Sequence, residues 1–342
     1  MAKPEEALSP LITNERLREL SGGGWLFRFL EQFPKVRQLR PGVEEPFLRG
    51  ALDIHVHADP CSLNPRNQDF TDVAISAAQA GMRAIVRKDH RFSTVGEAYA
   101  VQRHIDHLVD RGELATRVEV FGGVPLGYSL DPGQVKEALR FPTFKMLWFN
   151  PVGGEPLVQN GKVRPEVETI IAMARDNGIG INLGQPSHSV KNKGLNDFDG
   201  LMPLVEAISL AGGRAVLDHP LSSFSIEQIA ELCRGDMFAG LYCYPSLPSV
   251  IKAPLVDPNR TLDLLNRVGA ERCIIASDVG LLLEPTALEA YRQMVRLLLV
   301  MEVEGEAITT MIKTNPATLI GLNGTAAGNT VAGDTVAGAP AE

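Results

Sequence analysis

Eight short apolar runs recur between residues 51 and 279, and they constrain the fold more than any other feature of the chain. Most are rich in β-branched and apolar residues, which is typical of strands that are covered on both faces. We therefore interpret the runs as buried strands of a parallel sheet. They lie at 51–57, 82–88, 118–124, 144–150, 178–184, 214–220, 238–244 and 273–279.

Segments with helical periodicity lie between most of these runs. Several of them, such as PEVETIIAMARDNG and LMPLVEAISLAGG, end in glycine just before the next run, which is a common signal for the end of a helix. Eight alternating units of this kind predict an α/β protein with a (β/α)8 TIM barrel. The alternative is a doubly wound open sheet, but no GxGxxG motif follows the first run to support it.

Two flanking segments differ from the alternating region. The first 48 residues contain two stretches of helical spacing, LITNERLREL and WLFRFLEQF, which are split by three glycines. From about Asn323 the chain consists mainly of Gly, Ala, Thr and Val and lacks large apolar side chains. We expect a helical extension over 1–48, a barrel over 49–322 and a disordered tail over 323–342.

The overall charge argues against two classes of partner. The formal net charge is −8 and the isoelectric point is about 5.5. Nucleic acid or an anionic membrane is therefore not expected as the main partner. A small anionic substrate stays open, because a local cluster of basic residues can outweigh the global charge.

Cysteine content and the N-terminus predict a cytoplasmic protein. The four cysteines show no CxxC pairing and no dense framework, so we expect free thiols in a reducing compartment. The N-terminus has no apolar core of a signal peptide, and no apolar run is long enough to span a bilayer.

The first run ends in two histidines, His55 and His57. A spacing of two residues puts both imidazoles on one face of a strand. Two buried histidines are costly without partners, and a metal ion satisfies both of them. The competing interpretation is a solvated pair in a loop, which the clear apolar strand before it disfavours.

Polar residues also end the sixth and eighth runs. The sixth run ends in the string LDHP, which contains His219, and the eighth ends in SDV, which contains Asp278 and is followed by glycine. In a TIM barrel the carboxyl ends of all strands meet at one face, which brings these groups to His55 and His57. Three histidines and one aspartate predict a site for zinc or a similar divalent ion. Asp278 is expected to accept the proton of a metal-activated water.

These motifs resemble the amidohydrolase superfamily. The resemblance rests on HVH after the first strand, a His after the sixth, SDVG after the eighth and NPATLIGL at 315–322, and it covers roughly residues 49–322. The run DIHVHADP, followed by AGMRAIVRKDH and FKMLWFNP, is similar to metal-dependent hydrolases related to the phosphotriesterase and dihydroorotase types. The resemblance implies one or two metal ions, zinc or alternatively manganese, which activate water against a carbonyl or phosphoryl centre.

The chain departs from this pattern at the end of the fifth strand, where the family usually has a histidine. Gln185 stands near the expected position, and His188 follows three residues later. His188 is therefore a candidate metal ligand from the loop, and the alternative is a loop histidine that faces substrate or solvent. Gln185 is a candidate contact for the substrate. Without His188 the site would hold a single metal ion.

The resemblance also implies a carboxylated lysine that bridges two metals, usually on the fourth strand. Lys145 lies early in that run, and Lys88 ends the second run. An inward-facing Lys145 among apolar residues must be paired or carbamylated. Topology favours Lys145 for the carbamate, whereas Lys88 and the nearby His90 are candidates for substrate contact or metal binding. The sequence leaves these alternatives open.

Further polar side chains are expected at the mouth of the barrel. Arg66 lies in the loop after the first strand, where relatives often carry an arginine that binds the substrate, and its guanidinium is suited to a carboxylate. The alternative is a surface arginine in a polar loop. Asn150 and Tyr242 are also candidate substrate contacts. Tyr242 and Tyr244 are expected on the same face of the seventh strand.

These residues predict a metal-dependent hydrolase that cleaves an amide, lactam or lactone of a small substrate bearing a carboxylate. Two alternatives remain: a mononuclear metal-dependent decarboxylase on the same barrel, and a metal-binding barrel without turnover. The apolar N-terminal segment around Trp25 predicts packing on its own barrel or on a second copy, and we expect a homo-oligomer.

Overall fold

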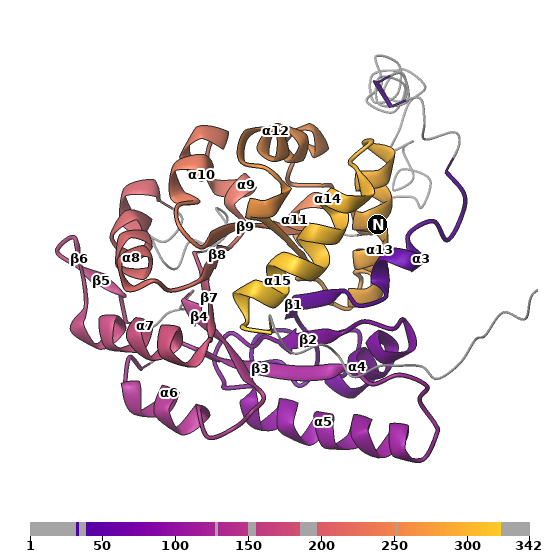
Figure 1. Cartoon of the computed structure of the whole chain (residues 1–342), viewed down its shortest axis with the longest axis horizontal. Coiled ribbons are helices and arrows are strands. Elements are labelled where there is room, and N and C mark those ends of the chain that lie inside the picture. The colour runs from indigo at the N-terminus through magenta and orange to yellow at the C-terminus, as the bar shows by residue number, and fades with distance from the viewer. Residues whose placement is uncertain are drawn as a thin grey trace, which may run out of the picture.

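The computed structural model describes residues 32–33, 39–126, 129–149, 155–184, 197–250 and 252–322. Eight parallel strands form one sheet with the order β1-β2-β3-β4-β7-β8-β9-β10, and helices surround it (Figure 1). This arrangement confirms the predicted (β/α)8 barrel. The strands are β1 (Leu52–Val56), β2 (Ala84–Arg87), β3 (Glu119–Pro125), β4 (Phe144–Phe149), β7 (Gly180–Leu183), β8 (Ala215–Leu217), β9 (Met237–Tyr242) and β10 (Cys273–Ala276).

Several helices begin or end at residues with identifiable capping roles. Ser225 and Gln228 form a reciprocal capping box at the start of α10. Gly178 and Gly212 follow α7 and α8 with φ of 65° and 70°, a left-handed conformation that glycine adopts without strain. The longer helices are α4 (Phe70–Gln79), α5 (Val95–Asp110), α6 (Pro132–Ala138), α7 (Pro165–Asn177), α8 (Phe198–Ala211), α10 (Ile226–Leu232), α12 (Pro258–Val268) and α13 (Ala287–Val300).

Apolar side chains fill the interior of the barrel, and a second, larger apolar cluster lies mostly between the strands and the helices. The interior cluster includes Leu52, Ile54, Ala84, Val86, Phe121, Met146, Trp148, Val216, Phe238, Tyr242, Ile274 and Ala276. Gly123 makes room for one of its largest rings, because a Cβ there would lie 2.6 Å from Nε1 of Trp148. The barrel is therefore a packed core rather than a pore.

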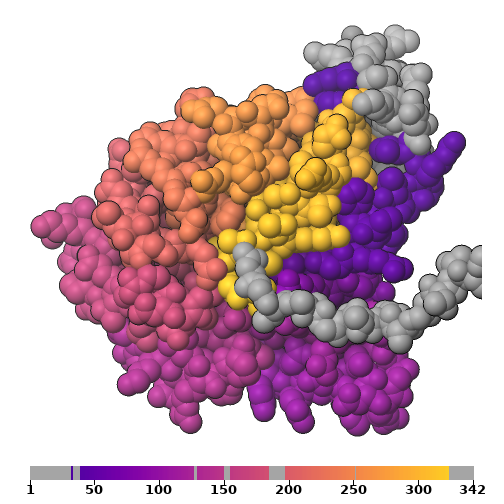
Figure 2. All heavy atoms as spheres, in the orientation of Figure 1, coloured from indigo at the N-terminus to yellow at the C-terminus, as the bar shows by residue number. Residues whose placement is uncertain are grey.

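The C-terminal segment closes the amino end of the barrel. Leu319 and Ile320, at the end of α15 (Asn315–Leu319), belong to the interior cluster. Arg83, which precedes β2, donates to the carbonyl of Leu322 over 3.0 Å, and Arg214, which precedes β8, donates to the carbonyl of Thr318. Figure 2 shows this yellow segment lying across the molecule between the indigo and the orange regions. Closure at this end leaves the carboxyl ends of the strands for the site.

Side-chain and backbone bonds join β1 to β10, the two strands at the ends of the sheet order. Asp53 Oδ1 accepts from the N–H of Ser277 over 3.0 Å, and Ser277 Oγ donates to the carbonyl of His55 over 3.2 Å. The N–H of Asp278 donates to the same carbonyl over 2.9 Å. Closer to the amino ends of the two strands, the hydroxyl of Tyr291 on α13 contacts the carbonyls of Leu52 and Ile275 at 2.9 and 3.3 Å. We call this set of contacts the β1–β10 seam.

Several predicted strands end earlier than expected, among them the sixth, seventh and eighth, and the eighth stops at Ala276. The sixth run stops at Leu217 because His219 has a φ of 48° and Pro220 begins the short helix α9 (Pro220–Ser223). The seventh run stops at Tyr242, and Tyr244 lies in α11 (Cys243–Ser246). The expectation that both tyrosines share one strand face was therefore wrong. The hairpin of β5 (Val158–Gln159) and β6 (Lys162–Val163) was not predicted.

Little of the two flanking segments lies within the described residues. The part of the N-terminal extension that is described includes Phe33, which packs with Met301, and α3 (Glu45–Leu48). Residues 1–31 and the tail from residue 323 lie outside the described ranges, so the expectations for Trp25 and for a disordered tail remain predictions. Among the helices that the structure describes, none is long and apolar enough to cross a membrane.

Replacing Tyr291 by phenylalanine is expected to destabilise the fold by about 1 kcal/mol, because a buried hydroxyl is lost from two carbonyls of the seam. The free energy of unfolding in urea is the measurement. Tyr99→Phe on α5 is the matched control, since that ring is 44% exposed, and it should leave stability unchanged. Equal losses in the two variants would show that the Tyr291 hydroxyl does not stabilise the seam.

Candidate metal centre

The two histidines of the first strand lie together at the carboxyl end of the barrel. His55 is in β1 and His57 follows it, and the centroids of their rings are 5.3 Å apart. Both side chains are buried. The His55 ring also packs at 5.2 Å from Trp148 and 4.9 Å from Tyr242, which are interior residues of β4 and β9. Side chains from two other strands therefore pack against the His55 ring and restrict its orientation.

The other two predicted ligands follow β8 and β10. His219 and Asp278 both have a φ of 48°, which is uncommon for residues that carry a Cβ. Such strain persists only where the surrounding structure enforces it, and it is frequent at functional sites. The N–H of Asp278 is held by the carbonyl of His55, as described for the β1–β10 seam.

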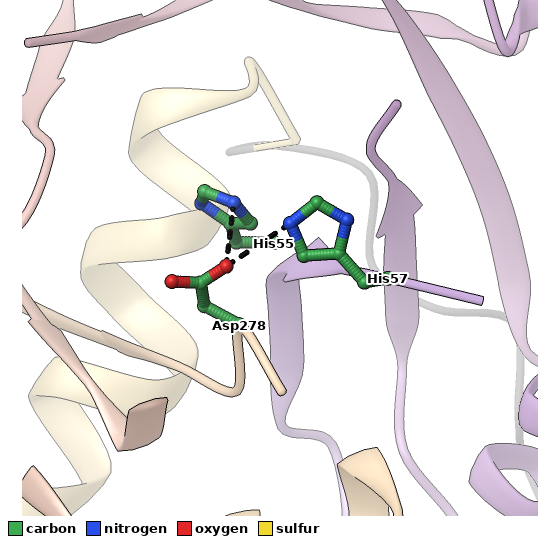
Figure 3. A group of neighbouring side chains, drawn as sticks. All are labelled: His55, His57 and Asp278. Atoms are coloured by element: carbon green, nitrogen blue, oxygen red, sulfur yellow. Dashed lines mark ion pairs between the residues drawn. The ribbon is translucent and has the colours of Figure 1, made fainter. Parts of the chain in front are cut away.

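The three imidazoles converge on one carboxylate. Nε2 of His55 and Nε2 of His57 each lie 3.1 Å from Oδ1 of Asp278, and Nε2 of His219 lies 2.9 Å from Oδ2. Figure 3 shows His55 and His57 directed at the Asp278 carboxylate from two sides. His55, His57 and Asp278 offer ligand atoms that all lie within 4.8 Å of one another. The structure thus brings together the four residues that the sequence predicted as a metal site.

The donor set fits a divalent metal ion such as zinc. Imidazole nitrogens with one carboxylate are the ligands that zinc prefers. Among the residues that the structure describes, Nδ1 of His55 has no hydrogen-bond partner, and it faces Oδ1 of Asp218 at 3.8 Å. A proton on that Nδ1 would point toward a carboxylate and leave the Nε2 lone pair for a cation, as in many metal-binding histidines.

The other ring nitrogen of His57, Nδ1, lies next to the positively charged side chain of Arg66. Nη2 of Arg66 lies 3.3 Å from Nδ1 of His57, and a guanidinium can only donate. This contact favours the tautomer with its proton on Nε2. A cation bound through Nε2 of His57 therefore requires the Arg66 guanidinium to turn to another partner, which makes Arg66 available to a ligand.

The electrostatics of the cluster favour neutral imidazole at His57 and carboxylate at Asp278. Burial lowers the pKa of His57 well below its ordinary value, against the attraction of Asp278, and Arg66 lowers it further. Burial alone would raise the pKa of Asp278, but His55 and His219 outweigh it and hold this pKa well below its ordinary value. Both groups are thus in the states that metal ligands need.

Three of the predicted substrate contacts surround this cluster. Lys88 directly follows β2, is buried, and places its Nζ 4.8 Å from the centre of the Trp148 ring. The ring of His90 stacks on that of His57 at 4.9 Å, and burial together with Lys88 and Arg66 lowers the pKa of His90 to about 3. Arg66 donates from Nε to Sγ of Cys61 over 3.3 Å. Two cationic side chains therefore lie beside the candidate metal ligands.

Tyr242 lies within the same cluster of rings. Its hydroxyl accepts a hydrogen bond from Nδ2 of Asn182 over 2.7 Å, and its ring contacts those of His55 and His219. Burial, together with Asp218 and Asp278, raises the pKa of Tyr242 well above its ordinary value, so the phenol stays protonated.

Lys145 is not brought to this cluster. It is the second residue of β4, and its Nζ lies 5.8 Å from the ring centre of Phe121. The charged groups that influence it are Glu119, which begins β3, and Arg214, which precedes β8. Both belong to the amino end of the barrel. The interior residue of β4 that reaches His55 is Trp148, because side chains alternate along a strand.

Asp218 was missed as a candidate for the site. Its Oδ1 lies 3.8 Å from Nδ1 of His55 and 3.7 Å from Nε2 of His219, and Asn182 approaches the same oxygen at 3.4 Å. The sequence signal was present, since a carboxylate that directly precedes a predicted ligand at the end of a buried strand needs partners of its own. Asn182 and Trp148 had no comparable signal, because each is an ordinary interior position of its strand.

Three predicted contacts lie outside the described residues: Asn150, Gln185 and His188. They belong to the segments that follow the fourth and fifth predicted strands. Their assignment as metal or substrate ligands therefore stays a prediction.

Solved structures with a similar fold include three bacterial proteins. One is a putative 2-pyrone-4,6-dicarboxylic acid hydrolase from Pseudomonas putida, with 14% identity, a TM-score of 0.53, and coverage of 80% of this chain and 98% of the other. A probable hydrolase of the same acid from Acinetobacter baumannii, with citric acid bound, shows 13% identity, a TM-score of 0.51, and coverage of 80% and 99%. An amidohydrolase from Burkholderia multivorans with bound zinc shows 12% identity, a TM-score of 0.51, and coverage of 79% and 99%.

At these identities the similarity concerns the fold, which is that of amidohydrolase-superfamily structures. No curated protein matches the chain in sequence. One protein family matches residues 50–239, which span the strands from β1 to β9 and include His55, His57 and His219. By this match over more than half of its length, the chain belongs to the family described as "Family of unknown function (DUF6282)".

Proposed function

We propose that the protein is a metal-dependent hydrolase of the amidohydrolase type, which cleaves an amide, lactam or lactone bond in a small substrate that carries a carboxylate. The observation that carries this proposal is the convergence of three imidazole Nε2 atoms on the two oxygens of Asp278. This arrangement lies at the carboxyl end of the strands, where TIM-barrel enzymes place their active sites.

The residues that would hold the metal are His55, His57, His219 and Asp278. A divalent ion held there supplies a Lewis acid that lowers the pKa of water and polarises a carbonyl group. Zinc is the first candidate because of the mixed nitrogen and oxygen donors, and the similarly folded Burkholderia multivorans amidohydrolase has bound zinc. Manganese is the alternative.

Asp278 is proposed as the general base. Its carboxylate stays ionised because the two histidines hold its pKa low, and it follows β10 at the carboxyl end of the barrel. It takes the proton of the attacking water and passes it to the leaving group. Tyr242, which stays protonated, is suited to donate a hydrogen bond to the carbonyl oxygen of the substrate.

Lys88 and Arg66 support the assignment of an anionic substrate. Both are buried beside the cluster; burial lowers the pKa of Lys88, and the negative charges of Asp218 and Asp278 oppose this shift. Arg66 becomes available once its contact with His57 is released, and a guanidinium binds a carboxylate through two parallel hydrogen bonds. The similarly folded Pseudomonas putida protein is named for a dicarboxylic acid, in agreement with this substrate class.

The purified protein is expected to contain close to one divalent ion per chain, because Trp148 fills the interior position of β4 beside His55 and Lys145 lies at the other end of the barrel. Elemental analysis is the measurement. His219→Ala should reduce the content, and His104→Ala, on the exposed face of α5, is the control that should not. Two ions per chain would contradict the single-ion arrangement, and none after addition of zinc or manganese would overturn the metal site.

Replacing Asp278 by asparagine is expected to lower kcat by about 10²- to 10⁴-fold while the fold is retained, because the amide cannot accept the proton of the attacking water. The assay uses a panel of lactones, lactams and amides that bear a carboxylate. Circular dichroism and metal content serve as controls for folding and loading. Unchanged turnover in the loaded variant would remove Asp278 from the proposed role.

The same panel separates hydrolysis from decarboxylation. In water labelled with ¹⁸O, hydrolysis places one labelled oxygen in the product. Release of carbon dioxide without incorporation of label would overturn the proposal in favour of a metal-dependent decarboxylase.

Replacing Lys88 by methionine is expected to raise KM for a carboxylate-bearing substrate by about 10- to 100-fold, which corresponds to the loss of one charge-assisted hydrogen bond. The KM of its neutral methyl ester should change little. Lys145→Met is the matched control, since it also removes a lysine charge from the barrel, but Lys145 is half-buried in β4 at the amino end. Parallel changes for the acid and the ester would show that Lys88 does not bind the carboxylate.

A further inference from the structure

Asp53 is a buried carboxylate of β1 that lies beside the candidate metal centre without reaching the point where the imidazoles converge. Its side chain is 3% exposed. Oδ1 accepts two backbone hydrogen bonds, from the N–H of His55 over 3.2 Å and from the N–H of Ser277 over 3.0 Å. One oxygen therefore binds a backbone group on each side of the β1–β10 seam.

The two backbone groups belong to opposite halves of the metal centre. His55 is itself a proposed ligand, and Ser277 directly precedes Asp278, the ligand that the other strand supplies. Two further bonds connect the same segments: Ser277 Oγ and the N–H of Asp278 both donate to the carbonyl of His55. The peptide units that carry the His55 ring and the Asp278 carboxylate are therefore held against each other.

This restraint matters because the two strands come from opposite ends of the chain. β1 is paired with β2 through a register shift between Asp53 and Val56, so the ladder on that side does not set the position of His55 in a regular way. Asp278 has a left-handed backbone, which is favoured only while its neighbours enforce it. Local structure alone thus leaves the separation of the His55 Nε2 and Asp278 carboxylate poorly determined.

We propose that Asp53 is a positioning residue that sets the separation between His55 and Asp278, and thereby the affinity and coordination geometry of the divalent ion. This inference rests on the metal site of the proposed function. Partners outside the ligand shell that orient metal ligands commonly account for 10- to 100-fold in metal affinity. Asp53 acts through the backbone rather than through a ring nitrogen, so its effect requires an acceptor oxygen and does not require a negative charge.

The test compares zinc affinity in four proteins by competition with a chromophoric chelator. Asp53→Ala removes the acceptor and is expected to weaken zinc binding by about 10- to 100-fold. Asp53→Asn keeps an acceptor oxygen of the same reach and is expected to bind zinc within a few-fold of the parent protein. Tyr291→Phe is the matched control, because it removes seam contacts to Leu52 and Ile275 and lowers stability, yet should leave zinc affinity unchanged.

A second variant and a second readout cover the case in which Asp53→Ala does not fold. Asp53→Glu keeps the charge but moves the acceptor by one methylene, so it is expected to weaken zinc binding while Asp53→Asn does not. With Co²⁺ as the probe, the visible absorption bands should differ from those of the parent in Asp53→Glu and stay the same in Tyr291→Phe. A residue that only stabilised the fold would not shift these bands.

The outcomes distinguish failure of this inference from failure of the metal site. If the parent protein does not bind zinc or Co²⁺, the metal site itself is overturned. If the parent binds zinc and Asp53→Ala or Asp53→Glu binds it equally well, only the positioning role is overturned. If Tyr291→Phe weakens zinc binding as much as Asp53→Ala, the effect belongs to general loosening of the seam, and the specific role of Asp53 is also overturned.

Discussion

The contact between β1 and β10 is the constraint on which the candidate metal centre depends. These strands supply His55 and Asp278, and they meet only when the barrel closes. Asp53, Ser277 and Tyr291 join them through hydrogen bonds to backbone groups on both sides. Buried backbone groups need partners, so these side chains both close the barrel and align the residues that extend beyond it. Folding and assembly of the site are thus the same event.

The two ends of the barrel have different roles. At the amino end, the C-terminal segment inserts Leu319 and Ile320 into the interior, and Arg83 and Arg214 donate to carbonyls of the same segment. At the carboxyl end, strands give way to left-handed residues and short loops that carry the polar groups. The contacts that close the amino end therefore lie away from the candidate metal ligands, in agreement with the division of roles in TIM barrels. Lys145 illustrates the difference: it is a lysine of a barrel strand, but it lies at the amino end and not beside the candidate metal ligands.

The polar groups at the carboxyl end form layers around the Asp278 carboxylate. The imidazoles of His55, His57 and His219 are nearest to it. Asp218 lies farther out and faces the rings of His55 and His219. Lys88 and Arg66 add positive charge next to these carboxylates, in a region that burial keeps away from water. Electrostatic interactions strengthen under such conditions. This environment suits a reaction in which an anionic substrate meets an ionised base beside a metal ion.

The eight strands, most of their helices and the convergence of His55, His57, His219 and Asp278 were predictable from the sequence by itself, because hydrophobic periodicity is local and because strand ends in a closed barrel meet at one face. The ends of the sixth and seventh strands were not, since they depend on the left-handed turn at His219 and on the start of α11. Only the tertiary structure placed Lys145 at the amino end, brought Asp218 to the histidines and joined Asp53 to Ser277. These relations connect residues on different strands, and the distance between two strands is set by packing and closure of the whole barrel, not by the spacing of residues along the chain.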